Sequence, residues 1–234
     1  MTLAGVDGCR AGWILIRWDG QHYSFDMFPT IKELVDKQPG RVLIDIPIGL
    51  GSKGFPRTIE KLMRKELAPR RSTVFNPPVY EALVEADPEI ARKINQEVEG
   101  KSLSVQTLNI CNKIREVDEL LSLDPSRPVY ECHPELAFKK LNEDQVVLSK
   151  KSTSDGLEER LRILEKFEPE SRMIYKHILD STQRKHVKPD DIMDALALCI
   201  TNKLGSASQL DFLVDEHSVN HQGIEIKIAY FSPS

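Results

Sequence analysis

The sequence predicts an α/β fold, and three features of the chain support this class. Short segments rich in β-branched and aromatic residues open the chain and are separated by glycine-containing turns. A strongly apolar segment, RVLIDIPIGL, follows at residues 41–50. Segments with helical periodicity then occupy most of the remainder. Strands therefore come first along the chain and helices later.

The first three strands are expected to form an antiparallel meander, because the turns DGCRAG and DGQ between them are short. Thr30 is placed to cap a short helix that runs to about Lys37. The three strands are expected at residues 3–6, 13–18 and 23–28.

The fourth strand is expected to be buried, because Val42, Leu43 and Ile44 leave almost no polar face. Asp45 interrupts this apolar run near its C-terminal end, where Pro47 ends the strand. An unpaired carboxylate is costly to bury, so Asp45 is expected to have a partner.

The remainder of the chain is expected to be mainly helical. A helical insertion is predicted at about residues 52–125, and a strand follows that ends near Glu131, before His133 and Pro134. The last long helix begins at Pro189 and is expected to stop at Gly205. We expect one domain over residues 1–234, with a further helix at about 156–167 and a late strand within 223–231.

Composition limits the class of protein. The 234 residues carry a formal net charge of -4, which argues against a surface built for bulk nucleic-acid binding but allows a local basic patch. The four cysteines show no C-x-x-C spacing, and no apolar run approaches the roughly 20 residues of a membrane span. We therefore expect a soluble, reduced, cytoplasmic protein without membrane contact.

Acidic residues stand at selected points of this pattern. Asp7 ends the first expected strand, Asp45 lies in the fourth, and Glu131 ends the fifth. Asp191 and Asp194 stand three residues apart on the last long helix and share one face of it. These acids are candidates for a common site.

Several motifs carry a resemblance to a known family. VDGCRAGW, IDIPIGL, GKSLSVQTLNICNKIREVD and ECHPE together resemble a domain-of-unknown-function family described as predicted nucleases with the ribonuclease H-like fold. The final helix, with D-x-x-D-A-L-A, is similar to that of Holliday-junction resolvases. The resemblance implies a mixed five-stranded sheet of order 3-2-1-4-5 with a helical insertion, and a metal-dependent nuclease.

Converging carboxylates suit phosphodiester hydrolysis by two metal ions, and Mg²⁺ or Mn²⁺ prefers such oxygen ligands. Asp7 would bridge the ions, Asp45 or Glu131 would hold one, and Asp191 with Asp194 would complete the site. The expected catalytic residues are Asp7, Asp45, Glu131 and Asp194, and the expected metal ligands are Asp7, Glu131, Asp191 and Asp194, with His133 and Lys150 as supporting residues.

Two of these acids also have a structural interpretation. Asp7 before Gly8 is typical of a turn, and either Asp190 or Asp191, which follow Pro189, could serve as a helix N-cap.

A basic segment favours a nucleic-acid partner, which is either DNA or RNA. The sequence leaves the oligomeric state open, and a dimer is one of the possibilities. It could place several cations on one helical face and two arginines in a following loop, although such charge runs are usually solvated surface. The expected nucleic-acid contacts are Arg57, Lys61, Arg64, Lys65, Arg70 and Arg71.

Two other functions stay open. VDGCRAGW also resembles the first phosphate loop of actin-like kinases and ATPases, although this chain has no second copy of the motif. Alternatively, the chain is a non-catalytic member of the fold that binds nucleic acid or another partner.

Overall fold

The computed structural model describes residues 2–38, 40–207 and 209–233. The chain forms two compact units: Met1–Asp45, Pro128–Phe212 and Ile228–Ser234 make up the first, and Ile46–Arg127 and Leu213–Lys227 the second. The second unit contains the segment that was expected as a helical insertion. Within the described ranges, no helix is long and apolar enough to cross a bilayer.

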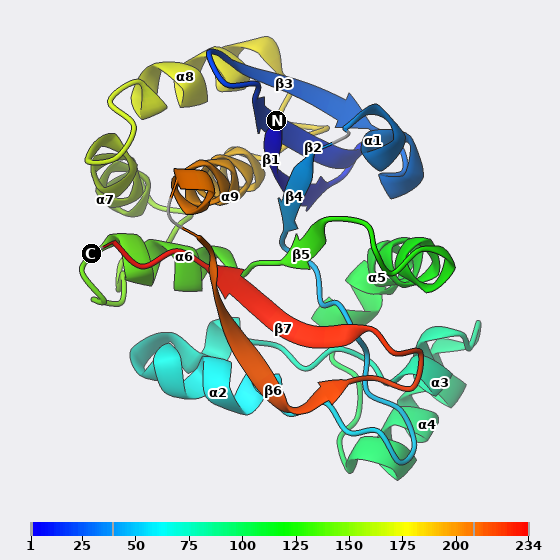
Figure 1. Cartoon of the computed structure of the whole chain (residues 1–234). Helices are drawn as coiled ribbons and strands as arrows, with labels where there is room; N and C mark the ends of the chain where they lie inside the picture. Colours follow the sequence, from blue (N-terminus) through cyan, green and yellow to red (C-terminus); the bar gives the residue numbers. More distant parts are fainter. Residues whose placement is uncertain (1, 39, 208, 234) are drawn as a thin grey trace. The chain divides into compact units, whose positions relative to one another are not determined.

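The first unit begins with three antiparallel strands, a short helix and a parallel strand (Figure 1). Thr30 accepts a hydrogen bond from the Glu33 N–H and so caps the short helix as expected. The elements are β1 (Leu3–Cys9), β2 (Gly12–Trp18), β3 (Tyr23–Phe28), α1 (Ile31–Lys37), β4 (Arg41–Ile44), β5 (Val129–Glu131), α6 (Pro134–Leu141), α7 (Ser154–Glu165), α8 (Ser171–Ser181) and α9 (Pro189–Ala207).

The sheet order is β3-β2-β1-β4-β5-β7-β6, which confirms the predicted 3-2-1-4-5 arrangement. Beyond the five strands of this arrangement, β7 (Glu225–Tyr230) and β6 (Asp211–Val219) extend the sheet past β5. β7 was expected as a late strand. β6 was missed because it is mostly exposed, so its sequence lacks the apolar alternation of a half-buried strand.

Helix α9 is the central helix of the first unit and lies against β1, β2 and β4 (Figure 1). Helices α6, α7 and α8 pack around α9. The core between them and the sheet is apolar and includes Ile14, Ile16, Phe138, Leu164 and Leu196. Burial of these side chains is the main stabilising term of the unit.

The close approach of α9 to β1 depends on Gly5. A Cβ atom added to Gly5 would lie 2.2 Å from both the Ala195 carbonyl oxygen and the Cys199 nitrogen. Only glycine leaves room for the helix backbone at this point of the strand.

Two helix predictions in this unit were wrong. Gly205 does not end the last helix, which continues to Ala207; instead, a Cβ at Gly205 would meet Leu210 Cδ2 at 2.4 Å, so this glycine serves close packing. Helix α6 was not expected after His133 and Pro134, yet Pro134 occupies its first turn, where a proline needs no N–H bond.

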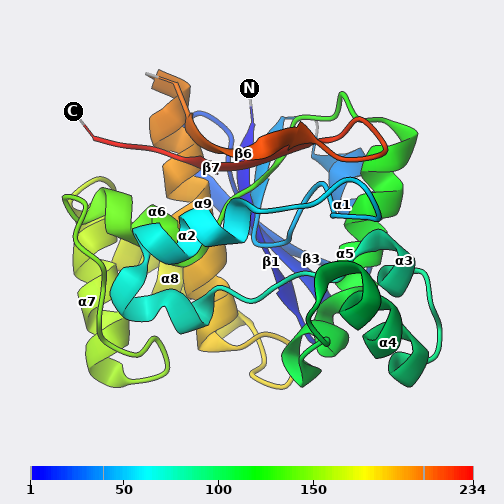
Figure 2. The same cartoon turned by 90° about the horizontal axis from the view of Figure 1, so that it is seen from below.

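The second unit is mainly helical. Helices α3, α4 and α5 lie together in Figure 2, and Val79, Ala82, Ala91 and Leu103 form a small core there. The helical elements of this unit are α2 (Ile59–Glu66), the 3₁₀ turn η1 (Ala68–Thr73), α3 (Tyr80–Leu83), α4 (Pro88–Glu99) and α5 (Val105–Leu123).

Candidate functional site: a carboxylate cluster

Strands β1 and β4 place Asp7 and Asp45 on the same face of the sheet. Gly5 pairs with Leu43 in the parallel register, and both residues face α9. Side chains alternate along a strand, so the residues two positions further, Asp7 and Asp45, face the same way. The Asp45 N–H donates to the Val6 carbonyl at 3.1 Å, which continues the ladder one residue past β4.

Helix α9 brings a third carboxylate to this face. Asp194 lies one turn before Leu198, which packs against Leu43 of β4. Its side chain is 3% exposed, whereas Asp7 and Asp45 are half-buried. Three segments that are far apart in the sequence therefore contribute one aspartate each to the same region.

The pKa shifts show that these carboxylates interact. Burial raises the pKa of Asp7 well above its ordinary value, and Asp45, Asp194 and Asp191 raise it further. Burial also raises the pKa of Asp45 to about 8, with Asp194 as the next cause. Each negative charge disfavours ionisation of the others, so the cluster attracts protons or cations.

Glu131 lies near enough to Asp45 to raise its pKa, although the strand register does not put the two side chains on one face of the sheet. Glu131 pairs with Ile44 across β4 and β5, and Ile44 pairs with Val6. The Glu131 side chain therefore points to the face opposite that of Asp7 and Asp45. Cys132, one residue further, occupies the α9 face instead and packs near Leu198.

Asp191 has a structural role at the start of α9. Its Oδ2 accepts a hydrogen bond from the Lys188 N–H at 2.9 Å, which satisfies a donor that the helix leaves unpaired. Burial raises the pKa of Asp191 to about 6, while this hydrogen bond acts in the opposite direction. Asp191 thus caps the helix and also adds negative potential near Asp7.

The two expected supporting residues lie at helix starts. His133 is the residue before α6, and its carbonyl accepts hydrogen bonds from the N–H groups of Leu136 and Ala137. Lys150 is exposed, and its carbonyl accepts hydrogen bonds from Thr153.

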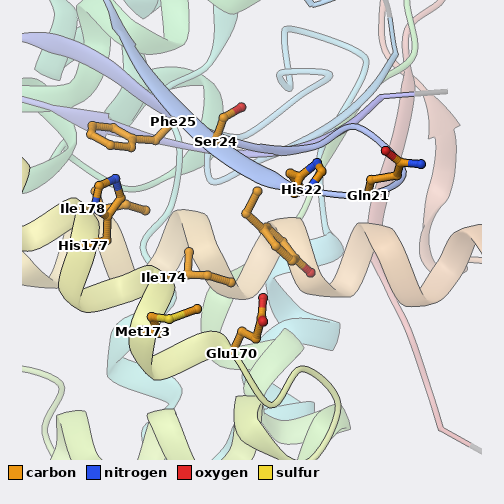
Figure 3. A pocket seen from close by; sticks show the side chains of 10 residues that line it. Gln21, His22, Ser24, Phe25, Glu170, Met173, Ile174, His177 and Ile178 are labelled. Atoms are coloured by element: carbon orange, nitrogen blue, oxygen red, sulfur yellow. The ribbon is translucent and has the colours of Figure 1, made fainter.

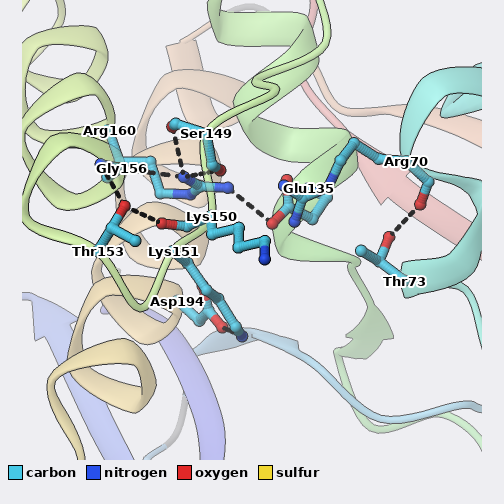
Figure 4. A network of polar contacts seen from close by, with 10 residues as sticks. All are labelled: Arg70, Thr73, Glu135, Ser149, Lys150, Lys151, Thr153, Gly156, Arg160 and Asp194. Atoms are coloured by element: carbon cyan, nitrogen blue, oxygen red, sulfur yellow. Dashed lines mark hydrogen bonds and ion pairs between the residues drawn. The ribbon is translucent and has the colours of Figure 1, made fainter.

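Lys151 and Glu135 were not among the predicted site residues. The Lys151 Nζ lies 2.6 Å from Asp194 Oδ2, and the two side chains are adjacent in Figure 4. Glu135, in the first turn of α6, forms a buried ion pair of 2.8 Å with Arg160 and raises the pKa of Asp194. The motif ECHPE contains Glu135, but nothing in its spacing distinguished Glu135 from Glu131.

Carboxylate oxygens are the ligands that hard divalent cations prefer. In this structure the Lys151 ammonium forms an ion pair with Asp194. Within residues 2–38, 40–207 and 209–233, no group of three or more His, Cys, Asp or Glu side chains is placed so that it could hold a metal ion.

The basic residues of the second unit are divided between interior and surface. Arg57 precedes α2, is buried and pairs with Glu60 at 2.7 Å, so it is not part of an exposed helical face as predicted. Arg64 is half-buried and donates to Asn76 Oδ1. Arg70, on η1, is half-buried. Three of the predicted nucleic-acid contacts are exposed: Lys61, Lys65 and Arg71.

A separate cavity lies between β3 and α8 in the first unit (Figure 3). It has a volume of about 510 Å³, and its lining includes Tyr23, Phe25, Ile174 and His177. None of the predicted site residues lines this cavity.

The protein has a mixed α/β fold, with interacting carboxylates on β1, directly after β4 and on α9. The family model of proteins of unknown function, DUF429, matches residues 5–216, and the chain belongs to this family. Comparison with curated proteins and with solved structures gave no match.

Proposed function

We propose that this protein is a divalent-metal-dependent nuclease that hydrolyses phosphodiester bonds. The observation that carries the proposal is the interaction of three aspartates from two sheet segments and a helix: beyond the effect of burial, Asp45 and Asp194 raise the pKa of Asp7, and Asp194 raises the pKa of Asp45. A cluster of like charges is costly unless a cation or protons compensate it. Asp7, Asp45 and Asp194 would hold Mg²⁺ or Mn²⁺, which supplies an activated water and stabilises charge on the leaving oxygen.

The residues of the chain have distinct parts in this proposal. Asp7 and Asp45 are half-buried and so accessible to a substrate phosphate, whereas the buried Asp194 is held in place by Lys151. Glu131 is left out of the proposed ligand set because its register places it on the other face. The exposed Lys61, Lys65 and Arg71 support a polyanionic substrate.

The test compares two aspartates that each precede a glycine. Purified protein is incubated with labelled single- and double-stranded DNA and RNA in Mg²⁺, Mn²⁺ or chelator. Asp7→Asn should reduce metal-dependent cleavage by about a hundredfold or more, because it removes a carboxylate from the metal site. Asp19→Asn is the matched control, since Asp19 only accepts hydrogen bonds from the backbone of Gln21 and His22.

Two results would contradict the proposal. One is the absence of cleavage on every substrate with either metal. The other is an Asp7→Asn protein that cleaves as fast as the wild type, which would leave Asp7 as a residue of β1 whose carboxylate only accepts the Gly8 N–H.

A further inference from the structure

A small cavity of the second unit has a lining in which cations outnumber carboxylates. It has a volume of about 150 Å³, whereas pockets that enclose drug-sized ligands measure roughly 300–1,000 Å³. Among the described residues, its charged lining consists of Arg57, Lys61, Arg64 and Lys101 with Glu60 and Glu99. The cavity therefore suits a compact anionic group.

The two carboxylates of the lining have cations beside them. Glu60 forms an ion pair of 2.7 Å with the buried Arg57. Burial raises the pKa of Glu99, whereas the ammonium groups of Lys101 and Lys61 lower it. Four cations less two carboxylates leave two positive charges along the lining.

Asp215 adds a negative charge next to Thr58, which also lines the cavity. The buried Asp215 carboxylate accepts the Thr58 N–H at 2.6 Å, the Thr58 hydroxyl at 3.1 Å and the His217 N–H at 2.8 Å. These donors stabilise its charge. Asp215 therefore reduces the positive excess at the cavity without reversing it.

Arg64 is held where it can bind oxygen atoms of a ligand. Its Nη2 donates to the Val74 carbonyl at 3.0 Å and to Asn76 Oδ1 at 2.7 Å. A guanidinium carries five N–H donors in a planar fork, so these two bonds do not exhaust Arg64. Asn76 lines the cavity as well, and its amide nitrogen is a further donor.

Asn95 connects two walls of the cavity. This buried side chain accepts the Val79 N–H at 2.8 Å through Oδ1 and donates to the Lys101 carbonyl at 2.8 Å through Nδ2. Val79 and Lys101 both line the cavity. Their backbone is thus fixed before a ligand arrives, which lowers the cost of binding.

We propose that this cavity binds a phosphate monoester group or inorganic phosphate. Such a group carries a charge of about −1.5 to −2 at pH 7 and three terminal oxygen atoms, whereas an internal phosphodiester carries one charge and must leave the site on two sides. Arg64, Lys61 and Lys101 supply the charge-assisted donors. The inference goes beyond the proposed function and does not depend on it, because the lining belongs to the second unit and the carboxylate cluster to the first.

The test is a calorimetric titration of the purified chain without divalent ions. The probes are inorganic phosphate and two thymidine dinucleotides, one with a 5′-phosphate and one with a 5′-hydroxyl. The wild type should bind phosphate and the phosphorylated dinucleotide saturably, and the hydroxyl form at least roughly tenfold more weakly, because it offers only a diester. Tighter binding of the phosphorylated dinucleotide than of phosphate would identify a nucleic-acid end as the ligand, and the reverse order a free phosphate; both orders support the site.

Variants of the lining should change the affinity for inorganic phosphate in opposite directions. Lys61→Gln and Lys101→Gln should each weaken binding about fivefold, since each removes a positive charge from the lining, and Glu99→Gln should strengthen it by a similar factor. Lys93→Gln is the matched control, because Lys93 is exposed on α4 of the same unit and does not line the cavity.

Thermal unfolding of each variant without phosphate identifies a protein that has failed to fold. Three results would overturn this inference: no saturable binding of phosphate or of the phosphorylated dinucleotide to the wild type, equal binding of the two dinucleotides, or an equal loss of affinity in Lys93→Gln and Lys61→Gln. Metal-dependent cleavage is measured separately, so each of these results leaves the proposed function standing.

Discussion

Arg160 is a fully buried cation that holds together three segments next to the carboxylate cluster. It donates to Glu135 Oε1 at 2.8 Å and to the carbonyls of Ser149 and Gly156. A buried charge is tolerated only where it has such partners, and removing one member exposes the other to the full cost of burial. Arg160 therefore links α7, α6 and the turn that carries Lys151.

Removing Arg160 alone should be strongly destabilising. Arg160→Met leaves the buried Glu135 without its cation, and we expect the free energy of unfolding to fall by about 3–5 kcal/mol. The double variant Arg160→Met with Glu135→Gln should recover a substantial part of this loss, because Gln carries no charge to compensate. Urea unfolding of the two single variants and the double variant measures the coupling. If the loss of unfolding free energy in the double variant equals the sum of the losses in the two single variants, Arg160 and Glu135 are not coupled.

At the residue scale, the sequence predicted part of the carboxylate cluster. Asp7, Asp45 and Asp194 were all expected as catalytic residues, and beyond the effect of burial, Asp45 and Asp194 raise the pKa of Asp7. Glu131 was expected in the same site, but its strand register differs from that of Asp45 by one residue, and such a difference separates the two faces of a sheet. The contact of Lys151 with Asp194 was not expected, because it joins segments 43 residues apart and no local spacing reports such a contact.

At the element scale, the packing of α9 on β1 decides where Asp194 meets Asp7. The helix backbone passes so close to Gly5 that an added Cβ would meet two backbone atoms, which have no freedom to move away. Near the other end of α9, the atoms that a Cβ at Gly205 would meet most closely belong to the Leu210 side chain. The two glycines therefore differ in what surrounds them.

Alanine at these two positions should have unequal effects. Gly5→Ala should lower the free energy of unfolding by more than about 3 kcal/mol, because α9 must move away from β1. Gly205→Ala should change it by less than about 1 kcal/mol, since a shift of Leu210 is offset by the better helix propensity of alanine. Chemical denaturation of both variants gives the comparison. An equal loss at the two sites would contradict the assignment of Gly5 as the tight contact.

Elements with a clear periodic pattern were predicted from the sequence, and the others were not. The strands β1, β2 and β3 and the buried strand β4 have apolar patterns that their own residues provide. Helix α6 follows His133 and Pro134 directly, where the proline suggested only a strand end. Its helical state depends on tertiary packing of Leu136, Phe138 and Leu141, which a local pattern does not contain.

On the scale of the whole molecule, two groups of carboxylates contribute to stability with opposite dependence on pH. Raised pKa values at Asp7, Asp45, Asp191 and Asp194 mean that the folded protein keeps protons which the unfolded chain has released. Their contribution to stability is lost as pH rises toward the folded pKa. Carboxyls with a lowered pKa lose their contribution as pH falls instead, and these include Asp19, Asp124, Asp144, Glu158 and Glu168.

The metal-free protein should therefore be most stable near pH 5 and lose stability as pH rises. Between the unfolded pKa of about 4 and the folded pKa of Asp45, about 8, the unfolded chain binds fewer protons, so the unfolding free energy falls with pH. Mn²⁺ competes with those protons, so the rise in melting temperature that it causes should be small near pH 5.5 and large near pH 8.5. Melting curves with chelator and with Mn²⁺ across this range measure both effects.

Asp45→Asn should flatten the pH dependence of the metal-free protein, which separates the cluster from the general repulsion of a chain with a net charge of -4. A metal-free melting temperature that rises from pH 5 to pH 8.5 would contradict the raised carboxylate pKa values and, with them, the clustering of Asp7, Asp45 and Asp194.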